Sequence, residues 1–103
     1  MKTWKVIVTE DVERDLDNAV YYLLFKKKNV QAAAAVIDDY DETVEELSRV
    51  AGIVRPIEDE KLQEYRRISF RRHDYYLVYR VEEDTAIVDR MLHKLQDIDN
   101  ILQ

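Results

Sequence analysis

The hydrophobic positions of this chain repeat every three to four residues in its first half and every second residue in its last third. The first period matches one face of an α-helix, and the second matches a strand with one buried face. Residues 4–8, WKVIV, precede the helical part and are mostly β-branched or aromatic, which is typical of a short strand. The pattern therefore predicts a strand, then helices, then strands.

The helical part predicts two helices joined by a short connection. Thr9 is the expected N-cap of the first, and Lys26, Lys27 and Lys28 follow its last apolar position, where cations suit the helix dipole. Its apolar stripe comprises Val12, Leu16, Ala19, Val20, Leu23 and Leu24. Asn29 begins the second helix, whose stripe comprises Ala33, Val36, Ile37, Tyr40, Val44, Leu47 and Val50. Gly52, the only glycine, is the expected C-terminal cap, and we expect the pair to form an antiparallel hairpin.

The last third predicts a meander of strands. Residues 53–63 contain the only proline and lack periodicity, so we expect a loop there with a helical turn at 58–62. The three expected strands are residues 65–72, 75–82 and 85–94. The turns between them lack glycine, so we expect connections looser than two-residue type I′ turns. Residues 98–103 are expected to form a short helical turn, or a tail that becomes ordered against a partner.

The predicted fold class is α+β, in the order β-α-α-β-β-β. We expect the helices to pack on one face of a mainly antiparallel sheet, which contains the early strand and a three-stranded antiparallel meander. Residues 1–103 are expected to form a single domain, because no repeat, linker or low-complexity tract divides them.

Composition narrows the class of protein. Hydrophobic residues make up 47% and charged residues 37% of the chain, as expected of a soluble globular protein. No apolar run approaches the roughly 18 residues of a membrane span, so no membrane association is predicted. The absence of cysteine excludes disulfides, thiolate catalysis and cysteine-based zinc clusters. No signal peptide precedes the first strand, so we expect a cytoplasmic protein.

Charge is distributed unevenly. The net charge of −6 argues against non-specific binding to nucleic acid. Residues 38–46 contain six acids and no base, and they are expected to form a solvated helix face. Residues 64–80 contain five arginines and two acids, a local charge of +3, so an anionic partner is possible on one face only. The pairs Arg66–Arg67 and Arg71–Arg72 would place one member on each side of a strand, so half of each pair is expected to meet acids of the loop or helices.

Three segments carry a resemblance to a known family. They are Arg66 at the start of the first late strand, YLVYRV at residues 76–81, and RMLHKLQD at residues 90–97. With the order of elements, they resemble the RelE/ParE superfamily of type II toxins over essentially the whole chain. The resemblance implies a toxin made beside a cognate antitoxin, acting as a homodimer or in a toxin–antitoxin hetero-oligomer. ParE-like members inhibit DNA gyrase, whereas RelE-like members cleave messenger RNA in the ribosome.

The nuclease alternative requires specific chemistry. Metal-free RNA cleavage requires cations at the phosphate and a group that exchanges a proton. The resemblance implies His93 as acid or base, with a reference pKa near ~6.5. Arg66, Arg80 or Arg90 would then stabilise the phosphate charge, with Arg80 and Arg66 as the predicted catalytic groups. These roles require the arginines to face the same way as His93. No cofactor and no metal site are predicted.

Three further residues are candidates for substrate binding: Tyr76, Arg90 and Lys94. The resemblance implies an arginine at position 76 in a nuclease, and losing such a cation would cost roughly 10²-fold in rate. Tyr76 therefore favours the ParE-like alternative, as does the closing segment at 90–97. An inactive binding module of the same fold is the third alternative.

Regular strand alternation predicts which side chains share a face. Tyr76, Val78 and Arg80 are expected on an open face, where Tyr76 could stack on a base. Tyr75, Leu77, Tyr79 and Val81 are expected under the helices. In the last strand, Ile87, Met91 and His93 would share one face and Val88 and Leu92 the other, with the direction of His93 left open. His73 is expected to be an ordinary turn residue.

Overall fold

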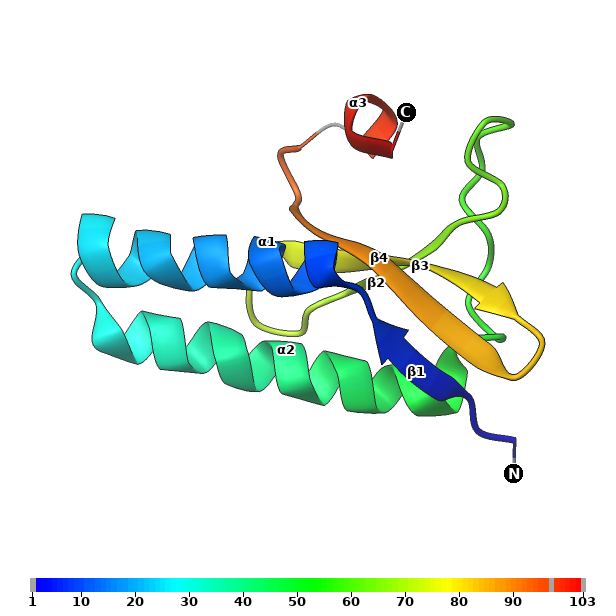
Figure 1. The fold of residues 1–103 in the computed structure, drawn as a ribbon, viewed down its shortest axis with the longest axis horizontal. Helices are drawn as coiled ribbons and strands as arrows, with labels where there is room; N and C mark the ends of the chain where they lie inside the picture. Colours follow the sequence, from blue (N-terminus) through cyan, green and yellow to red (C-terminus); the bar gives the residue numbers. More distant parts are fainter. Residues whose placement is uncertain (1, 97, 103) are drawn as a thin grey trace.

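The computed structural model describes residues 2–96 and 98–102 and contains helices and strands in the predicted order (Figure 1). The elements are β1 (Lys5–Val8), α1 (Glu10–Tyr21), the π-helical η1 (Tyr22–Lys26), α2 (Val30–Val50), β2 (Arg66–Ser69), β3 (Tyr75–Glu82), β4 (Thr85–His93) and α3 (Ile98–Leu102). Within these described residues, no helix is long and apolar enough to cross a bilayer.

The sheet has the strand order β1-β4-β3-β2. Strands β2, β3 and β4 form the predicted antiparallel meander. Strand β1 pairs in parallel with β4, from Lys5 opposite Thr85 to Val8 opposite Val88, so the sheet is mixed. The helical hairpin of α1, η1 and α2 lies on one face of this sheet, which confirms the α+β class (Figure 1).

The main core lies between the hairpin and the sheet. Its fully buried residues include Val12 of α1, Leu47 of α2, and Leu77 and Tyr79 of β3. The Tyr79 hydroxyl donates a hydrogen bond of 2.9 Å to the carbonyl oxygen of Ala51, just after α2. Burial raises the pKa of Tyr79 to about 12, and the positive charge of nearby Arg66 opposes part of this rise. Tyr75 and Val81 pack against the same core, so the prediction that alternate β3 residues lie under the helices is confirmed.

A β-bulge interrupts the alternation of β4. Val78 pairs with Arg90 and Tyr79 pairs with Val88, so Asp89 is an extra residue without an opposite partner. Because of this insertion, Val88 and Met91 both lie in the core beneath the hairpin. The predicted grouping of Val88 with Leu92, and of Ile87 with Met91, is wrong, because it assumed unbroken alternation.

The opposite face of the sheet is also covered. Tyr76, Val78 and Leu92 form a second cluster there, packed against Tyr65 and α3. The α3 residues in this cluster are Ile98, Ile101 and Leu102. Tyr76 faces away from the hairpin as predicted, but it is only 4% exposed. The expectation that it lies on an open face is therefore wrong, because α3 and Tyr65 fill that space.

The helix ends differ from the predictions in two places. Thr9 occupies the N-cap position of α1, but its hydroxyl donates to the carbonyl oxygen of Val88, 2.9 Å away, instead of capping the helix. Asn29 does cap α2, accepting a hydrogen bond from the Ala32 amide. Gly52 follows α2 without a positive φ. A Cβ at this position would overlap the Trp4 ring, so close packing, rather than a left-handed cap, requires glycine.

The two turns of the meander differ from each other. Glu82 pairs with Thr85, so Glu83 and Asp84 form a two-residue connection in which Glu83 has a φ of 54°. The prediction of a looser turn is wrong here, because Glu83 adopts the left-handed conformation without glycine. The β2–β3 connection is longer: Ser69 pairs with Tyr76, and the Phe70 amide donates to the Tyr75 carbonyl.

Candidate functional site

Arg66 of β2 points towards the C-terminal end of α2. Its Nη1 donates to the carbonyl oxygens of Val54 at 2.9 Å and Ala51 at 3.3 Å. These carbonyls belong to the chain just beyond the helix, where cations interact favourably with the helix dipole. The guanidinium therefore secures the exit from α2.

Arg80 of β3 lies on the face opposite the hairpin and is held by the bulge residue. Its Nε and Nη2 donate to the two carboxylate oxygens of Asp89 at 2.7 and 3.0 Å, and Nη1 lies 3.3 Å from Glu82. The hydrogen bonds to Asp89 raise the pKa of Arg80. A bidentate pair of this kind fixes the guanidinium and balances its charge.

Arg90 of β4 forms a second bidentate pair, with Asp15 of α1. Nε and Nη2 donate to the Asp15 carboxylate at 2.8 and 2.9 Å. The same carboxylate accepts the Met91 amide at 2.9 Å, at the part of β4 that β1 leaves unpaired. The hydrogen bonds to Asp15 raise the pKa of Arg90. This contact attaches α1 to the sheet.

His93 ends β4 beside a polar cleft between that strand and α1. The cleft is lined by Asp15, Asn18, Ala19, Tyr75, Arg90, Met91, His93 and Gln96. The imidazole lies edge-on to the Tyr75 ring, with centroids 5.2 Å apart, and Nδ1 accepts the Leu95 amide at 3.2 Å. An accepting Nδ1 leaves Nε2 to carry the proton of the neutral ring.

The two remaining candidates lie elsewhere. Lys94 forms an exposed ion pair of 3.7 Å with Asp74, in the β2–β3 connection. Tyr76 is covered by the second core cluster, and the Arg67 guanidinium lies 5.5 Å from its ring centroid. Neither side chain reaches the cleft beside His93.

The three predicted catalytic residues do not converge. Arg66 pairs with Tyr79 and His93 pairs with Tyr75, four positions apart on β3. At ~3.3 Å per residue this is about 13 Å along the strand. Arg80 lies on the opposite face of the sheet. Only His93 and Arg90 of the predicted set share a cleft.

Metal binding has no candidate site in the described residues. No group of three or more side chains of the metal-ligating types His, Asp and Glu comes together in residues 2–96 and 98–102.

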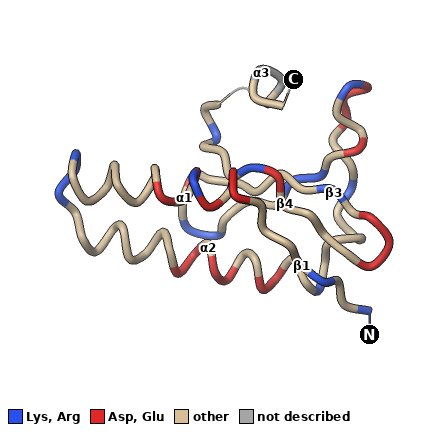
Figure 2. The backbone as a smooth tube through the Cα atoms, in the orientation of Figure 1, with Lys and Arg blue, Asp and Glu red and all other residues tan. Residues whose placement is uncertain are grey.

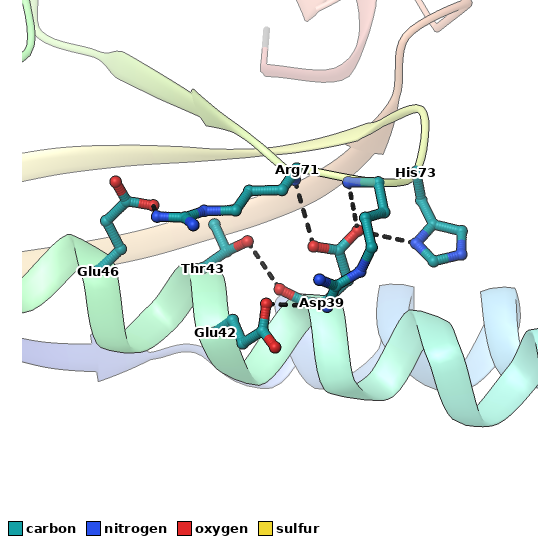
Figure 3. Close-up of polar contacts among 7 residues, drawn as sticks. Asp39, Glu42, Thr43, Glu46, Arg71 and His73 are labelled. Carbon is teal, nitrogen blue, oxygen red and sulfur yellow. Dashed lines mark hydrogen bonds and ion pairs between the residues drawn. The ribbon is translucent and has the colours of Figure 1, made fainter.

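A buried carboxylate in α2 holds the β2–β3 turn, a role that the sequence analysis did not predict. Asp39 is fully buried and accepts hydrogen bonds from the Arg71 amide at 3.2 Å and the Arg72 amide at 3.0 Å (Figure 3). Its Oδ2 lies 2.7 Å from Nδ1 of His73. Burial raises the pKa of Asp39, but His73 and the two amides outweigh burial, and the pKa lies below its ordinary value.

Two ion pairs surround this buried contact. Arg71 pairs with Glu46 at 3.3 Å and Arg72 with Glu42 at 2.8 Å (Figure 3). Both members of this pair meet helix acids, where only one was expected, because β2 ends at Ser69 and strand alternation does not apply to them. The expectation that residues 38–46 form only a solvated face is wrong for Asp39. The available signal was its position: it lies three residues after buried Val36 and four before buried Thr43.

Comparisons with known proteins give one family match and similarities of fold. Residues 6–98 match the family described as the ParE toxin of the type II toxin–antitoxin system parDE. The fold is similar to a structure of the chromosomal ParDE toxin–antitoxin system from P. aeruginosa, with a TM-score of 0.72, 20% identity, and 88% and 96% of the two chains covered. It is also similar to the toxin–antitoxin complex RelBE2 from Mycobacterium tuberculosis, with a TM-score of 0.56, 25% identity, and 88% and 98% covered. No curated protein sequence matches this chain.

Proposed function

We propose, since this chain belongs to the ParE toxin family of type II toxin–antitoxin systems, that it inhibits DNA gyrase through protein–protein contact. The observation that carries the proposal is the separation of the candidate catalytic groups. Arg66, Arg80 and Arg90 each have hydrogen-bond partners within the fold, and Arg66 and Arg80 lie away from His93. The proposed site of action is the cytoplasm.

The chemistry of RNA cleavage supports this choice. A phosphorane requires cations aimed at the place where its charge develops, together with a proton-exchanging group within hydrogen-bond reach. Arg90 is beside His93, but its charge is balanced by Asp15 through two hydrogen bonds. Freeing Arg90 would leave the Asp15 carboxylate, which also accepts the Met91 amide, without its charged partner.

The proposed regulatory partner is a cognate antitoxin. Both structural neighbours are toxin–antitoxin systems, and their similarity covers 88% of this chain in each case. We infer that an antitoxin binds this chain and masks the surface with which it contacts its target.

The second candidate function is ribosome-dependent cleavage of messenger RNA. It is favoured by the cleft in which His93, Arg90 and Tyr75 lie together. In this alternative His93 donates or accepts the proton. Arg90 must leave Asp15 and contact a phosphate instead. A third alternative, an inactive binding module, requires only the fold.

Two assays with the purified chain separate these functions. We expect inhibition of gyrase-catalysed DNA supercoiling in a reaction without ribosomes. We also expect no cleavage of messenger RNA on translating ribosomes, and unchanged inhibition of growth by His93→Ala, because His93 has no catalytic role in the proposed function. Lys61→Ala, an exposed substitution in the loop before β2, is the matched control.

Other results in the same assays would establish one of the two alternative functions. Cleavage of messenger RNA that His93→Ala lowers by about 10²-fold, a magnitude typical of general acid–base groups, would establish the nuclease. A chain that neither inhibits supercoiling nor slows growth would leave only the binding module.

A further inference from the structure

The turn end of the helical hairpin carries a cluster of exposed hydrophobic side chains. We define the hairpin tip as residues 21–30, which comprise the end of α1, η1 and the connection to the start of α2. This segment extends beyond the sheet (Figure 1). Four large apolar side chains are strongly exposed there: Tyr21 at 58%, Tyr22 at 48%, Phe25 at 61% and Val30 at 70%. Contiguous apolar exposure of this kind marks interaction sites, whereas single exposed residues do not.

Two of these side chains form a continuous apolar surface. The Tyr21 and Phe25 rings are in contact, with centroids 4.6 Å apart. The segment is π-helical from Tyr22 to Lys26, and Leu23 within it packs against the main core. Leu23 and Leu24 are half-buried, whereas the aromatic side chains at positions 21, 22 and 25 are exposed. Single turns of π-helix occur frequently at functional sites.

The charge of the tip is opposite to that of the chain. Residues 18–37 contain Lys26, Lys27 and Lys28 and no acid, so the net charge outside them is −6 − 3 = −9. The three lysines are exposed, and none takes part in an ion pair with another described residue. Lys27 lies over the Tyr22 ring, 5.7 Å from its centroid. The basic tip stands apart from the acids of α2 (Figure 2).

We propose that the hairpin tip docks on the protein that this toxin inhibits, at an apolar pocket rimmed by carboxylates. The inference rests on the proposed function and assigns its contact surface. The rings of Tyr21 and Phe25 supply the apolar anchor, and the lysines supply charge complementarity. Aromatic anchors surrounded by polar groups dominate the energetics of protein interfaces.

A protein fits this surface better than RNA does. Nucleic-acid sites use many cations along a phosphate path, whereas the tip has three cations beside four exposed apolar side chains. The chain's overall charge of −6 would also repel an RNA surface. The acids of a protein rim would meet the lysines while apolar groups cover the rings.

The test uses two variants of the tip and two matched controls. Lys26→Glu/Lys27→Glu/Lys28→Glu reverses the charge, with Lys5→Glu/Arg55→Glu/Lys61→Glu as the control that reverses three exposed cations elsewhere. Tyr21→Ser/Phe25→Ser removes the rings, with Ile53→Ser/Leu95→Ser as the control, since these residues are 73% and 89% exposed. Because all of these positions are exposed, we expect the variants to fold, which urea unfolding checks.

Growth inhibition and gyrase inhibition are the two readouts. We expect each tip variant to lose growth inhibition and to require a concentration higher by about 10-fold or more for half-inhibition of supercoiling. The controls should match the unaltered chain. Folded tip variants that stay as toxic as the controls would overturn the inference.

The two proposals can fail separately. If the unaltered chain slows growth without inhibiting gyrase, the proposed target is wrong, but loss of toxicity in the tip variants still supports the tip as the contact surface. If the unaltered chain does not slow growth, both proposals fail. Tip-dependent binding to phosphatidylglycerol vesicles, or tip-dependent self-association in sedimentation, with toxicity unchanged, would assign the surface to a lipid or a second copy and overturn the inference.

Discussion

Asp39 holds the turn between β2 and β3 against α2 with a single carboxylate. Its oxygens accept hydrogen bonds from two backbone amides and contact the His73 ring, and these partners lie 32 to 34 residues away in sequence. A local sequence pattern cannot indicate partners at that distance. The other acids of residues 38–46 also made Asp39 look like one more solvated side chain. Only its place on the buried stripe of α2, between Val36 and Thr43, indicated a role.

We expect Asp39→Asn to lower the free energy of unfolding by about 2 kcal/mol, because a buried amide or imidazole loses its acceptor. The loss should depend on pH. The pKa of Asp39 is lower in the folded chain, so its stabilisation is present above the unfolded pKa near ~3.9 and is lost as pH falls through the folded value. Urea unfolding between pH 7 and pH 3, followed by Trp4 fluorescence, measures the difference.

The control for this experiment is Asp38→Asn, which removes the neighbouring exposed carboxylate. The difference between Asp39→Asn and the unaltered chain should shrink with acid, while Asp38→Asn should change little at any pH. Equal effects of the two substitutions would contradict the assigned role.

At the scale of elements, the β4 bulge and α1 depend on one another. Strand β1 pairs with β4 only as far as Val88, just before the bulge at Asp89, and beyond it Asp15 of α1 supplies the acceptor for the Met91 amide. The bulge also places Arg90 where it meets Asp15. The helix and strand periods were sufficient to predict the elements, but a bulge leaves no mark in an alternating sequence.

We expect Asp15→Ala to lower the free energy of unfolding by about 2–3 kcal/mol, since Arg90 and the Met91 amide both lose their acceptor. Hydrogen exchange at the Met91 amide should also become faster. Unfolding in urea and amide exchange measured by NMR check both outcomes. Asp17→Ala, at an exposed position of the same helix, is the control. Unchanged exchange at Met91 would show that Asp15 does not close this part of the sheet.

At the scale of the whole molecule, the sheet is covered on both faces. The hairpin covers one face and α3 covers Tyr76, Val78 and Leu92 on the other. Sequence periodicity predicted the first layer because each helix had an apolar stripe. It did not predict the second, because five residues of α3 are too short for a stripe and their site depends on the finished sheet.

We expect Ile98→Ser/Leu102→Ser to lower the free energy of unfolding by about 1–3 kcal/mol, because both side chains pack on the second cluster. The exposed face should also bind the dye ANS. Urea unfolding and ANS fluorescence measure the two effects. Leu95→Ser, at a position 89% exposed, should leave both unchanged. A double variant as stable as this control would mean that α3 adds no cover to the sheet.

The parallel pairing of β1 with β4 has a consequence for the timing of synthesis. Residues 5–8 emerge from the ribosome early, yet their partners are residues 85–88. Until translation reaches those codons, β1 lacks the strand with which it forms hydrogen bonds. The hairpin can then pack against only part of the sheet. A nascent chain therefore completes its fold late, and truncated translation products of this gene lack a finished sheet.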